Sequence, residues 1–186
     1  MPKSHPVRPQ RGCRPRRGFV GSLLRASDGS AAVEFGMVAL PFILMLFAIL
    51  EIGLVFVTDS ILENATITTG RLVRTGQASA LGMTSETFKA SLCSRMSIFS
   101  SDCANRAQID VRVIPQFATV PPDPMDGGAF DEGELTYSNG APGDLILVRV
   151  WYRHTLITTF LSQGLSRLSD GTAMLTAATA FRNEPL

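Results

Sequence analysis

The sequence predicts an α+β protein in which one long N-terminal transmembrane α-helix continues into a small exported domain with an antiparallel sheet. Three observations lead to this prediction. The 16 residues from Phe35 to Leu50 carry no charge, and the apolar run resumes after Glu51 as far as Val57. Seven bases and one acid precede this run in residues 1–28, whereas residues 29–186 hold ten bases and fifteen acids. Further along, two segments alternate polar and apolar residues, as half-buried strands do.

The apolar run is long enough to cross a membrane. As a helix, the 23 residues from Phe35 to Val57 would span about 35 Å, against about 30 Å for the hydrocarbon core of a bilayer. No base follows the run until Arg71, so the positive-inside rule places the N-terminus in the cytoplasm and exports the remainder. A buried helix of a soluble protein is the alternative, but such helices are rarely so uniformly apolar.

The segment fits a removable secretory signal poorly. Such a signal has a short basic region, 7 to 15 apolar residues and then a small-x-small cleavage site. Here the basic region is long, the acids Asp28 and Glu34 stand before the apolar run, and the run passes through Glu51 without an A-x-A signal. We therefore expect the membrane helix to be retained in the mature protein.

Glu34 stands where the membrane helix should begin, directly before Phe35. A charged side chain in a membrane helix costs about 2.5 to 3.5 kcal/mol at the bilayer centre and marks a functional site by default. Cleavage after Gly29 would give it a partner, since the new α-amine of Ser30 would lie one helical turn away at spacing i to i+4. The pair could form within one chain or between neighbouring subunits. Alternatively, Glu34 only reaches the headgroups or favours the positive end of the helix dipole.

Four short motifs follow one another between residues 29 and 71. They are Gly29–Phe35 (GSAAVEF), Ala39–Pro41 (ALP), Glu51–Gly53 (EIG), and Leu62–Ala65 (LENA) followed by Gly70–Arg71. In this order and spacing the segment resembles the TadE-like family of minor pilins, or pseudopilins, from tight-adherence, Flp-type pilus systems. The resemblance covers under a quarter of the chain. The 157 residues that would remain after cleavage fit the TadE and TadF types better than the longer TadG type.

The resemblance implies a processing site and a set of partners. It implies cleavage between Gly29 and Ser30 by an inner-membrane prepilin peptidase, with Glu34 and Phe35 as assembly and recognition residues of the mature chain. Other pilins, pilus-assembly membrane proteins and the lipid bilayer are the implied partners. The protein would cross the bacterial inner membrane once, with a periplasmic C-terminal domain on a type IV pilin-like plan, and could stay associated with the pilus. Pro41 removes one backbone hydrogen bond and should bend the membrane helix.

The chain divides into four predicted segments: a basic leader over residues 1–29, the transmembrane helix over 30–58, a helix extension and break over 59–82, and the exported domain over 83–186. Apolar residues at helical spacing extend the first helix to about Arg74, and glycines at 76 and 82 mark the break. Thr84 or Ser85 could cap a second helix that runs to about Phe99. Its apolar face would comprise Phe88, Leu92, Met96 and Phe99.

Cys93 and Cys103 are the two cysteines of the exported body, because Cys13 lies in the basic leader. Two thiols ten residues apart in an oxidising compartment predict a disulfide. A metal site is the alternative, but the chain has no Cys or His at zinc spacing. We predict no cofactor and no bound metal.

Residues 108–114 and 145–157 predict two strands, and residues 172–181 predict a third, although their alanines leave a helix open. Between the first two lies an acidic segment rich in turn formers, predicted as a loop. Its acids could gather Ca²⁺, but EF-hand spacing is absent and a solvated loop is favoured. These acids are Asp123, Asp126, Asp131, Glu132 and Glu134.

Other functional classes are less well supported by the sequence. His5 and His154 stand in different segments, so motif spacing assembles no nucleophile, base and orienting group, and we predict no enzyme activity. The arginines of the leader lack interleaved aromatic residues beyond Phe19, which argues against a nucleic-acid partner. The main alternative is an uncleaved, single-pass membrane anchor that carries a periplasmic scaffold or binding domain.

Overall fold

The computed structural model describes residues 27–119, 121–126, 128–158, 164 and 168–185. The chain divides into two compact units, Met1–Met45 and Leu46–Leu186. The helices among the described residues are α2 (Ser27–Arg74), α3 (Gln77–Ala80), α4 (Ser85–Ser94), α5 (Ser100–Arg106) and the 3₁₀ turns η1 (Ser97–Phe99) and η2 (Glu132–Glu134). Its strands are β1 (Ala107–Ile114), β2 (Met125–Asp126), β3 (Ala129–Phe130), β4 (Leu145–His154) and β5 (Ala173–Arg182).

Helix α2 is 48 residues long and changes character along its length. Up to Val57 its large apolar side chains are mostly exposed, whereas Leu62, Ala65 and Val73 are buried in the core of the second unit. Among the described helices, α2 alone is long and apolar enough to cross a membrane. Exposed apolar side chains are stable in lipid and costly in water, so this pattern fits a single crossing. The predicted end of the helix near Arg74 is confirmed.

Helix α4 begins where the sequence indicated and ends earlier. Thr84 caps it, with the Thr84 and Thr87 side chains each accepting a hydrogen bond from the other's backbone N–H, an arrangement like a capping box. The prediction that this helix reaches Phe99 is wrong, because α4 stops at Ser94 and η1 and α5 follow. Ser97 has a φ of 52°, a left-handed conformation that a continuous right-handed helix excludes. Even so, Phe88, Leu92 and Met96 are buried, as predicted.

The main sheet is antiparallel, in the order β1-β4-β5, and confirms the α+β prediction. The predicted strand at 108–114 is confirmed, and the third segment is a strand rather than a helix. Central strand β4 ends at His154, three residues before the predicted end at Ile157. The backbone N–H groups of Ile157 and Thr158 donate to the side chain of Glu51 instead of to a neighbouring strand.

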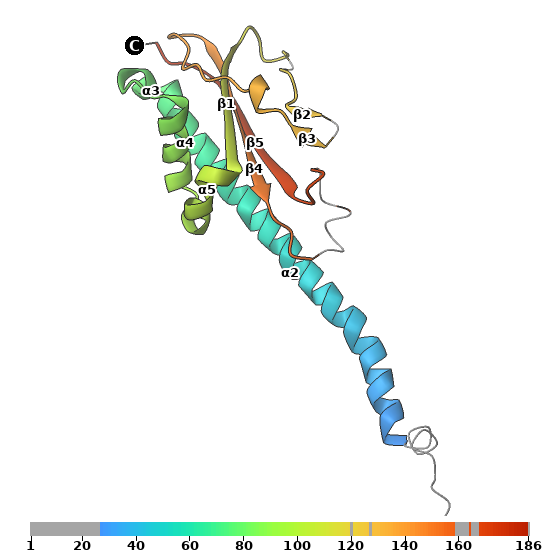
Figure 1. Ribbon diagram of the computed structural model, residues 1–186. Helices are drawn as coiled ribbons and strands as arrows, with labels where there is room; N and C mark the ends of the chain where they lie inside the picture. The colour runs from blue at the N-terminus through green and yellow to red at the C-terminus, as the bar shows by residue number, and fades with distance from the viewer. Residues whose placement is uncertain (1–26, 120, 127, 159–163, 165–167, 186) are drawn as a thin grey trace, which may run out of the picture. The chain divides into compact units, whose positions relative to one another are not determined.

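Both faces of the sheet are covered within the second unit (Figure 1). One face packs against α2, α4 and α5 through a core that includes Phe88, Val111, Val148 and Tyr152. A smaller cluster around Trp151 covers the other face, and Phe130 of β3 packs against it. Residues 121–134 were predicted to form a loop, which is wrong in part, since β2, β3 and η2 lie within them. These elements have only two or three residues each, too few for a periodic sequence signal.

Candidate functional site: the start of α2 and its junction with the sheet domain

Gly29 and Ser30 lie in the first turns of α2 and are exposed. The Ser30 hydroxyl donates to Glu34 Oε1 at 3.2 Å, so the two residues face each other across one helical turn. A Cβ at Gly29 would meet open space among the described residues. The peptide bond between Gly29 and Ser30 is therefore helical in the full-length chain. Residues 1–26 of the predicted leader lie outside the described residues.

Glu34 and Phe35 are both exposed on α2, and Phe35 is among the most exposed large apolar side chains. An exposed carboxylate next to an exposed aromatic ring can contact lipid or another helix. Pro41 lies inside α2 without ending it. The bend expected at Pro41 stays a prediction.

Glu51 lies further along the same helix and has only 5% of its surface exposed. Its two carboxylate oxygens accept hydrogen bonds from the backbone N–H groups of Ile157 and Thr158, the latter at 2.9 Å. The turn after β4 is thereby fastened to α2 (Figure 1). Sequence analysis placed Glu51 in a motif but missed this contact, because its partners are main-chain groups 106 and 107 residues away.

His154, the last residue of β4, is also buried next to this junction. Burial and the nearby Arg106 guanidinium lower the pKa of His154, and the negative charge of Glu51 partly opposes them. The Arg106 guanidinium also donates to the Thr155 hydroxyl at 3.3 Å. A neutral imidazole is therefore favoured between α2, α5 and the turn.

Gly70 lies where α2 approaches strand β5 most tightly among the glycines of this helix. A Cβ at this position would lie 3.2 Å from the Phe181 ring and 3.3 Å from the Thr179 methyl group of β5. Both distances are tighter than ordinary contact, so glycine lets the helix and the strand approach closely. Asn64, from the preceding motif, accepts a hydrogen bond from the Thr68 hydroxyl at 3.3 Å.

Asp110 is the main buried charge of the sheet, and sequence analysis missed it. Arg112 donates to both Asp110 carboxylate oxygens, at 3.0 and 2.8 Å from Nε and 2.7 Å from Nη2. Arg149, which lies opposite Asp110 on the neighbouring strand β4, donates two hydrogen bonds to Asp110 Oδ2, at 3.0 and 2.8 Å. The backbone N–H and the hydroxyl of Thr136 donate two more to Asp110 Oδ1. Burial alone would raise the pKa of Asp110, but these hydrogen bonds hold it below its ordinary value of 3.8.

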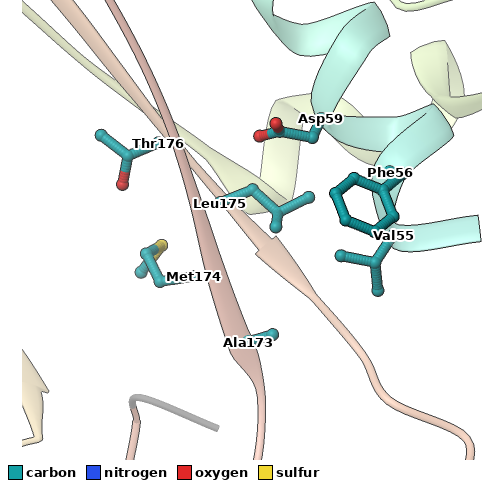
Figure 2. Close-up of a pocket in the computed structure, with 7 residues that line it drawn as sticks. All are labelled: Val55, Phe56, Asp59, Ala173, Met174, Leu175 and Thr176. Carbon is teal, nitrogen blue, oxygen red and sulfur yellow. The ribbon is translucent and has the colours of Figure 1, made fainter. Parts of the chain in front are cut away.

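The Asp110 cluster fastens the long connection between β1 and β4 to the sheet. Arg112 also donates to the carbonyl of Glu134 at 2.7 Å, and Arg149 to the carbonyl of Pro122 at 2.8 Å. Each guanidinium thus joins the buried carboxylate to a different part of the acidic segment. The arrangement is structural. A separate cavity is lined by residues of α2 and β5 (Figure 2).

That cavity lies between α2 and the beginning of β5 and has a volume of about 360 Å³. Its lining is mostly apolar. Figure 2 shows Val55 and Phe56 of α2 on the same side of β5 as Leu175, with Asp59 one turn further along the helix. The cavity is partly open and mostly apolar, so it could accept an apolar chain rather than enclose a polar substrate.

A disulfide joins Cys93 of α4 to Cys103 of α5, with the two Cα atoms 5.4 Å apart. Both cysteines are buried, and the bond connects helices whose separation the irregular turn at Ser97 would otherwise leave free. The described residues contain no group of three or more His, Cys, Asp or Glu side chains that could hold a metal ion.

Comparison with known protein families bears on the helix that carries these features. Residues 29–71 match the family model of TadE-like proteins. No curated protein and no solved structure matches the chain. The TadE-like segment, residues 29–71, contains the Gly29/Ser30 junction, Glu34, Pro41, Glu51 and Gly70.

The TadE-like segment ends within α2, before the rest of the domain begins. The disulfide, the Asp110 cluster and the whole sheet lie beyond residue 71. Two residues of the segment, Glu51 and Gly70, nevertheless make contacts with that sheet or with the turn at its edge. The matched helix therefore serves both as a candidate membrane anchor and as one wall of the domain.

Proposed function

We propose that this protein is a minor pilin or pseudopilin that takes part in the biogenesis of a tight-adherence, Flp-type pilus and in surface adherence. The observation that carries the proposal is the match of residues 29–71 to TadE-like proteins. It coincides with a single exposed apolar helix that leads directly into an α+β domain. The proposed role is structural rather than catalytic.

In the proposed processing step, a prepilin peptidase hydrolyses the peptide bond between Gly29 and Ser30. The leader leaves with a new carboxylate on Gly29, and the mature chain starts with the α-amine of Ser30. Glu34 lies one helical turn away, and its contact with the Ser30 hydroxyl supports this spacing. The amine could neutralise Glu34 of its own chain or of the next subunit, which would set the register of packed helices.

The charge distribution supports an orientation for this protein. The basic leader would stay in the cytoplasm, α2 would cross the inner membrane once, and the domain with its disulfide would fold in the periplasm. Partners in this arrangement are the peptidase, other pilins and pilus-assembly membrane proteins. An uncleaved, single-pass anchor with a periplasmic scaffold or binding domain is the competing function.

N-terminal sequencing of the protein extracted from membranes separates the two functions. The pilin-like proposal expects a chain that begins at Ser30, whereas a plain anchor retains the arginines of the leader. Gly29→Leu should block processing, because it places a bulky side chain at the bond to be cut. Gly36→Leu is the matched control, since Gly36 lies in the same helix and also faces open space among the described residues. A wild-type chain that keeps residues 1–29 would overturn the proposal.

The assembly role of Glu34 needs a separate test. Glu34→Ala should leave membrane insertion and cleavage intact while reducing incorporation into the pilus machinery, or pilus-dependent adherence, by at least about tenfold. Glu63→Ala, at an exposed acid of α2 beyond the predicted membrane segment, should have little effect. Normal assembly of Glu34→Ala would show that the carboxylate is not needed for pairing.

A further inference from the structure

The turn after β4 lies beside an apolar part of α2. It comprises residues 155–158, and Glu51 holds it through the backbone N–H groups of Ile157 and Thr158. The next residues of α2 carry exposed apolar side chains: Ile52, Leu54, Phe56 and Val57. The first charged residue of α2 after Glu51 is Asp59. The turn therefore reaches back along the helix, past the point where the apolar surface ends.

Counting along the helix gives the depth of this turn. A hydrocarbon core of about 30 Å needs about 20 helical residues, which from Phe35 extends to about Leu54. Glu51 then falls inside the outer boundary of the core, by about one helical turn. A turn fastened to Glu51 therefore lies close to the same boundary.

The hydrogen bonds between Glu51 and the turn are compatible with a position at the membrane boundary. Irregular backbone occurs at membrane depth only where protein groups satisfy its N–H and C=O groups. Glu51 accepts hydrogen bonds from two of the N–H groups of the turn, and burial within the protein leaves only 5% of this residue exposed. The carboxylate and these two main-chain groups thus satisfy each other's hydrogen-bonding capacity.

Ile157 is 82% exposed, the highest value among the exposed large apolar residues of the described chain. It projects from a turn whose neighbouring strand end, His154, pairs with Ala173 of β5. Ala173 also lines the apolar cavity that Val55 and Phe56 form with β5 (Figure 2). Helix, turn and cavity therefore lie close to one another at the end of the domain where the turn meets α2.

We propose that the surface at this end, the seating surface, is immersed in the outer leaflet of the bilayer, with Ile157 inserted among phospholipid acyl chains. The seating surface consists of the turn 155–158 and the cavity-lining residues Val55, Phe56, Ala173 and Leu175. Lipid contact removes the Ile157 side chain from water and fills the open side of the cavity. The domain is then held at a fixed depth by two attachments, α2 and the turn. The proposal rests on the membrane-crossing part of the proposed function and not on its role in a pilus.

Depth-dependent fluorescence quenching tests the proposal on the full chain reconstituted in phosphatidylcholine vesicles. The chain has a single tryptophan, Trp151, so Trp151→Phe gives a background without tryptophan. Ile157→Trp in that background should be quenched at least about threefold more by lipids brominated near the headgroup than the control Leu81→Trp. Leu81 is a matched control because it is 73% exposed and follows α3, beyond the outer end of α2. Equal quenching of the two variants would overturn the proposal.

Cysteine labelling provides a second measurement that does not alter Trp151. In a Cys13→Ser background, Ile157→Cys should react with a membrane-impermeant maleimide at least about tenfold more slowly than Leu81→Cys in vesicles. The two rates should converge once detergent at high concentration replaces the bilayer. Equal rates in vesicles would place the turn in water and overturn the proposal. Alkaline extraction reports separately on the anchor, so failure of the seating surface can be told from failure of the membrane crossing.

Discussion

Asp110 shows how one residue can organise a sheet and the connection that covers it. Its carboxylate is fully buried and accepts hydrogen bonds from two guanidinium groups and from Thr136. A buried charge is tolerated only when it is paired and hydrogen-bonded, and removing one partner leaves the others uncompensated. Asp110 is likewise the buried negative charge that compensates the two guanidinium groups.

We expect Asp110→Asn to lower the free energy of unfolding of the domain that contains the sheet by about 3 to 5 kcal/mol. The substitution keeps the size of the side chain but leaves Arg112 and Arg149 facing a neutral group. Chemical denaturation followed by circular dichroism measures the change. Glu63→Gln, at an exposed acid, should change the value by less than about 0.5 kcal/mol. A loss below 1 kcal/mol at Asp110 would mean that water or a shifted side chain compensates the arginines.

Glu51 allows a local measurement at the membrane end of the domain. Glu51→Ala removes the acceptor for the N–H groups of Ile157 and Thr158, so their amide hydrogens should exchange at least about tenfold faster. Hydrogen exchange read by mass spectrometry on a peptide covering residues 155–158 gives the rate. Exchange in the strand β4 should change little, and an unchanged rate at Ile157 would show that the turn is held by other contacts.

The contacts of Glu51 and Asp110 could not be predicted from the sequence. Glu51 could be singled out because it interrupts an apolar run, but its partners are backbone groups, which carry no side-chain signature. Asp110 lies in a segment whose alternation predicted a strand with a solvated polar face. The acidic connection covers that face, and the arginines that compensate Asp110 come partly from another strand.

At the scale of elements, α2 and β5 are packed unusually closely at Gly70. Gly70→Leu would drive a side chain into Phe181 and Thr179, and we expect the free energy of unfolding of the domain to fall by about 1 to 3 kcal/mol, as overpacking does. Gly53→Leu is the control, because a Cβ there meets open space among the described residues. Both substitutions raise helix propensity, so the difference in thermal unfolding between them isolates the contact with β5. Equal stability would show that β5 can move away from the helix.

Elements with a strong local signal were predictable, and those defined by tertiary contacts were not. The Thr84 cap, the start of β4 at Leu145 and the end of α2 at Arg74 all have signals within a few residues. The end of β4 depends on Glu51, far away in the chain. Likewise, α4 stops early at Ser94, and no sequence motif indicated the left-handed conformation of Ser97 that follows it.

For the molecule as a whole, two buried groups with lowered pKa values make stability depend on pH. His154 titrates below its ordinary 6.5 and Asp110 below its ordinary 3.8 in the folded state. In both cases the unfolded chain binds the proton more readily, so stability is complete above the unfolded pKa and falls as the pH falls towards the folded pKa.

We therefore expect the free energy of unfolding to fall in two ranges, first below about pH 6.5 and again below about pH 4. Chemical denaturation of the protein between pH 8 and pH 3 measures both decreases in the free energy of unfolding. His154→Gln should reduce the loss of stability below about pH 6.5 and leave the loss below about pH 4 unchanged. Asp110→Asn should reduce the loss below about pH 4 and leave the loss below about pH 6.5 unchanged. A wild-type profile that is flat between pH 7 and pH 5 would show that His154 is charged or solvated in the folded protein.

The close contact at Gly70 is one of several contacts that join the outer end of α2 to β5 and the residues directly after it. Glu184 donates its backbone N–H to the carbonyl of Arg74 at 2.9 Å and pairs with the Arg74 side chain at 3.2 Å. The outer end of α2 is thus completed by residues more than one hundred positions later. In the orientation proposed above, the polypeptide would have to cross the membrane as far as Glu184 before the domain could close. Export would then deliver an unfolded chain, which would need protection from proteases and from its neighbours until β5 arrived.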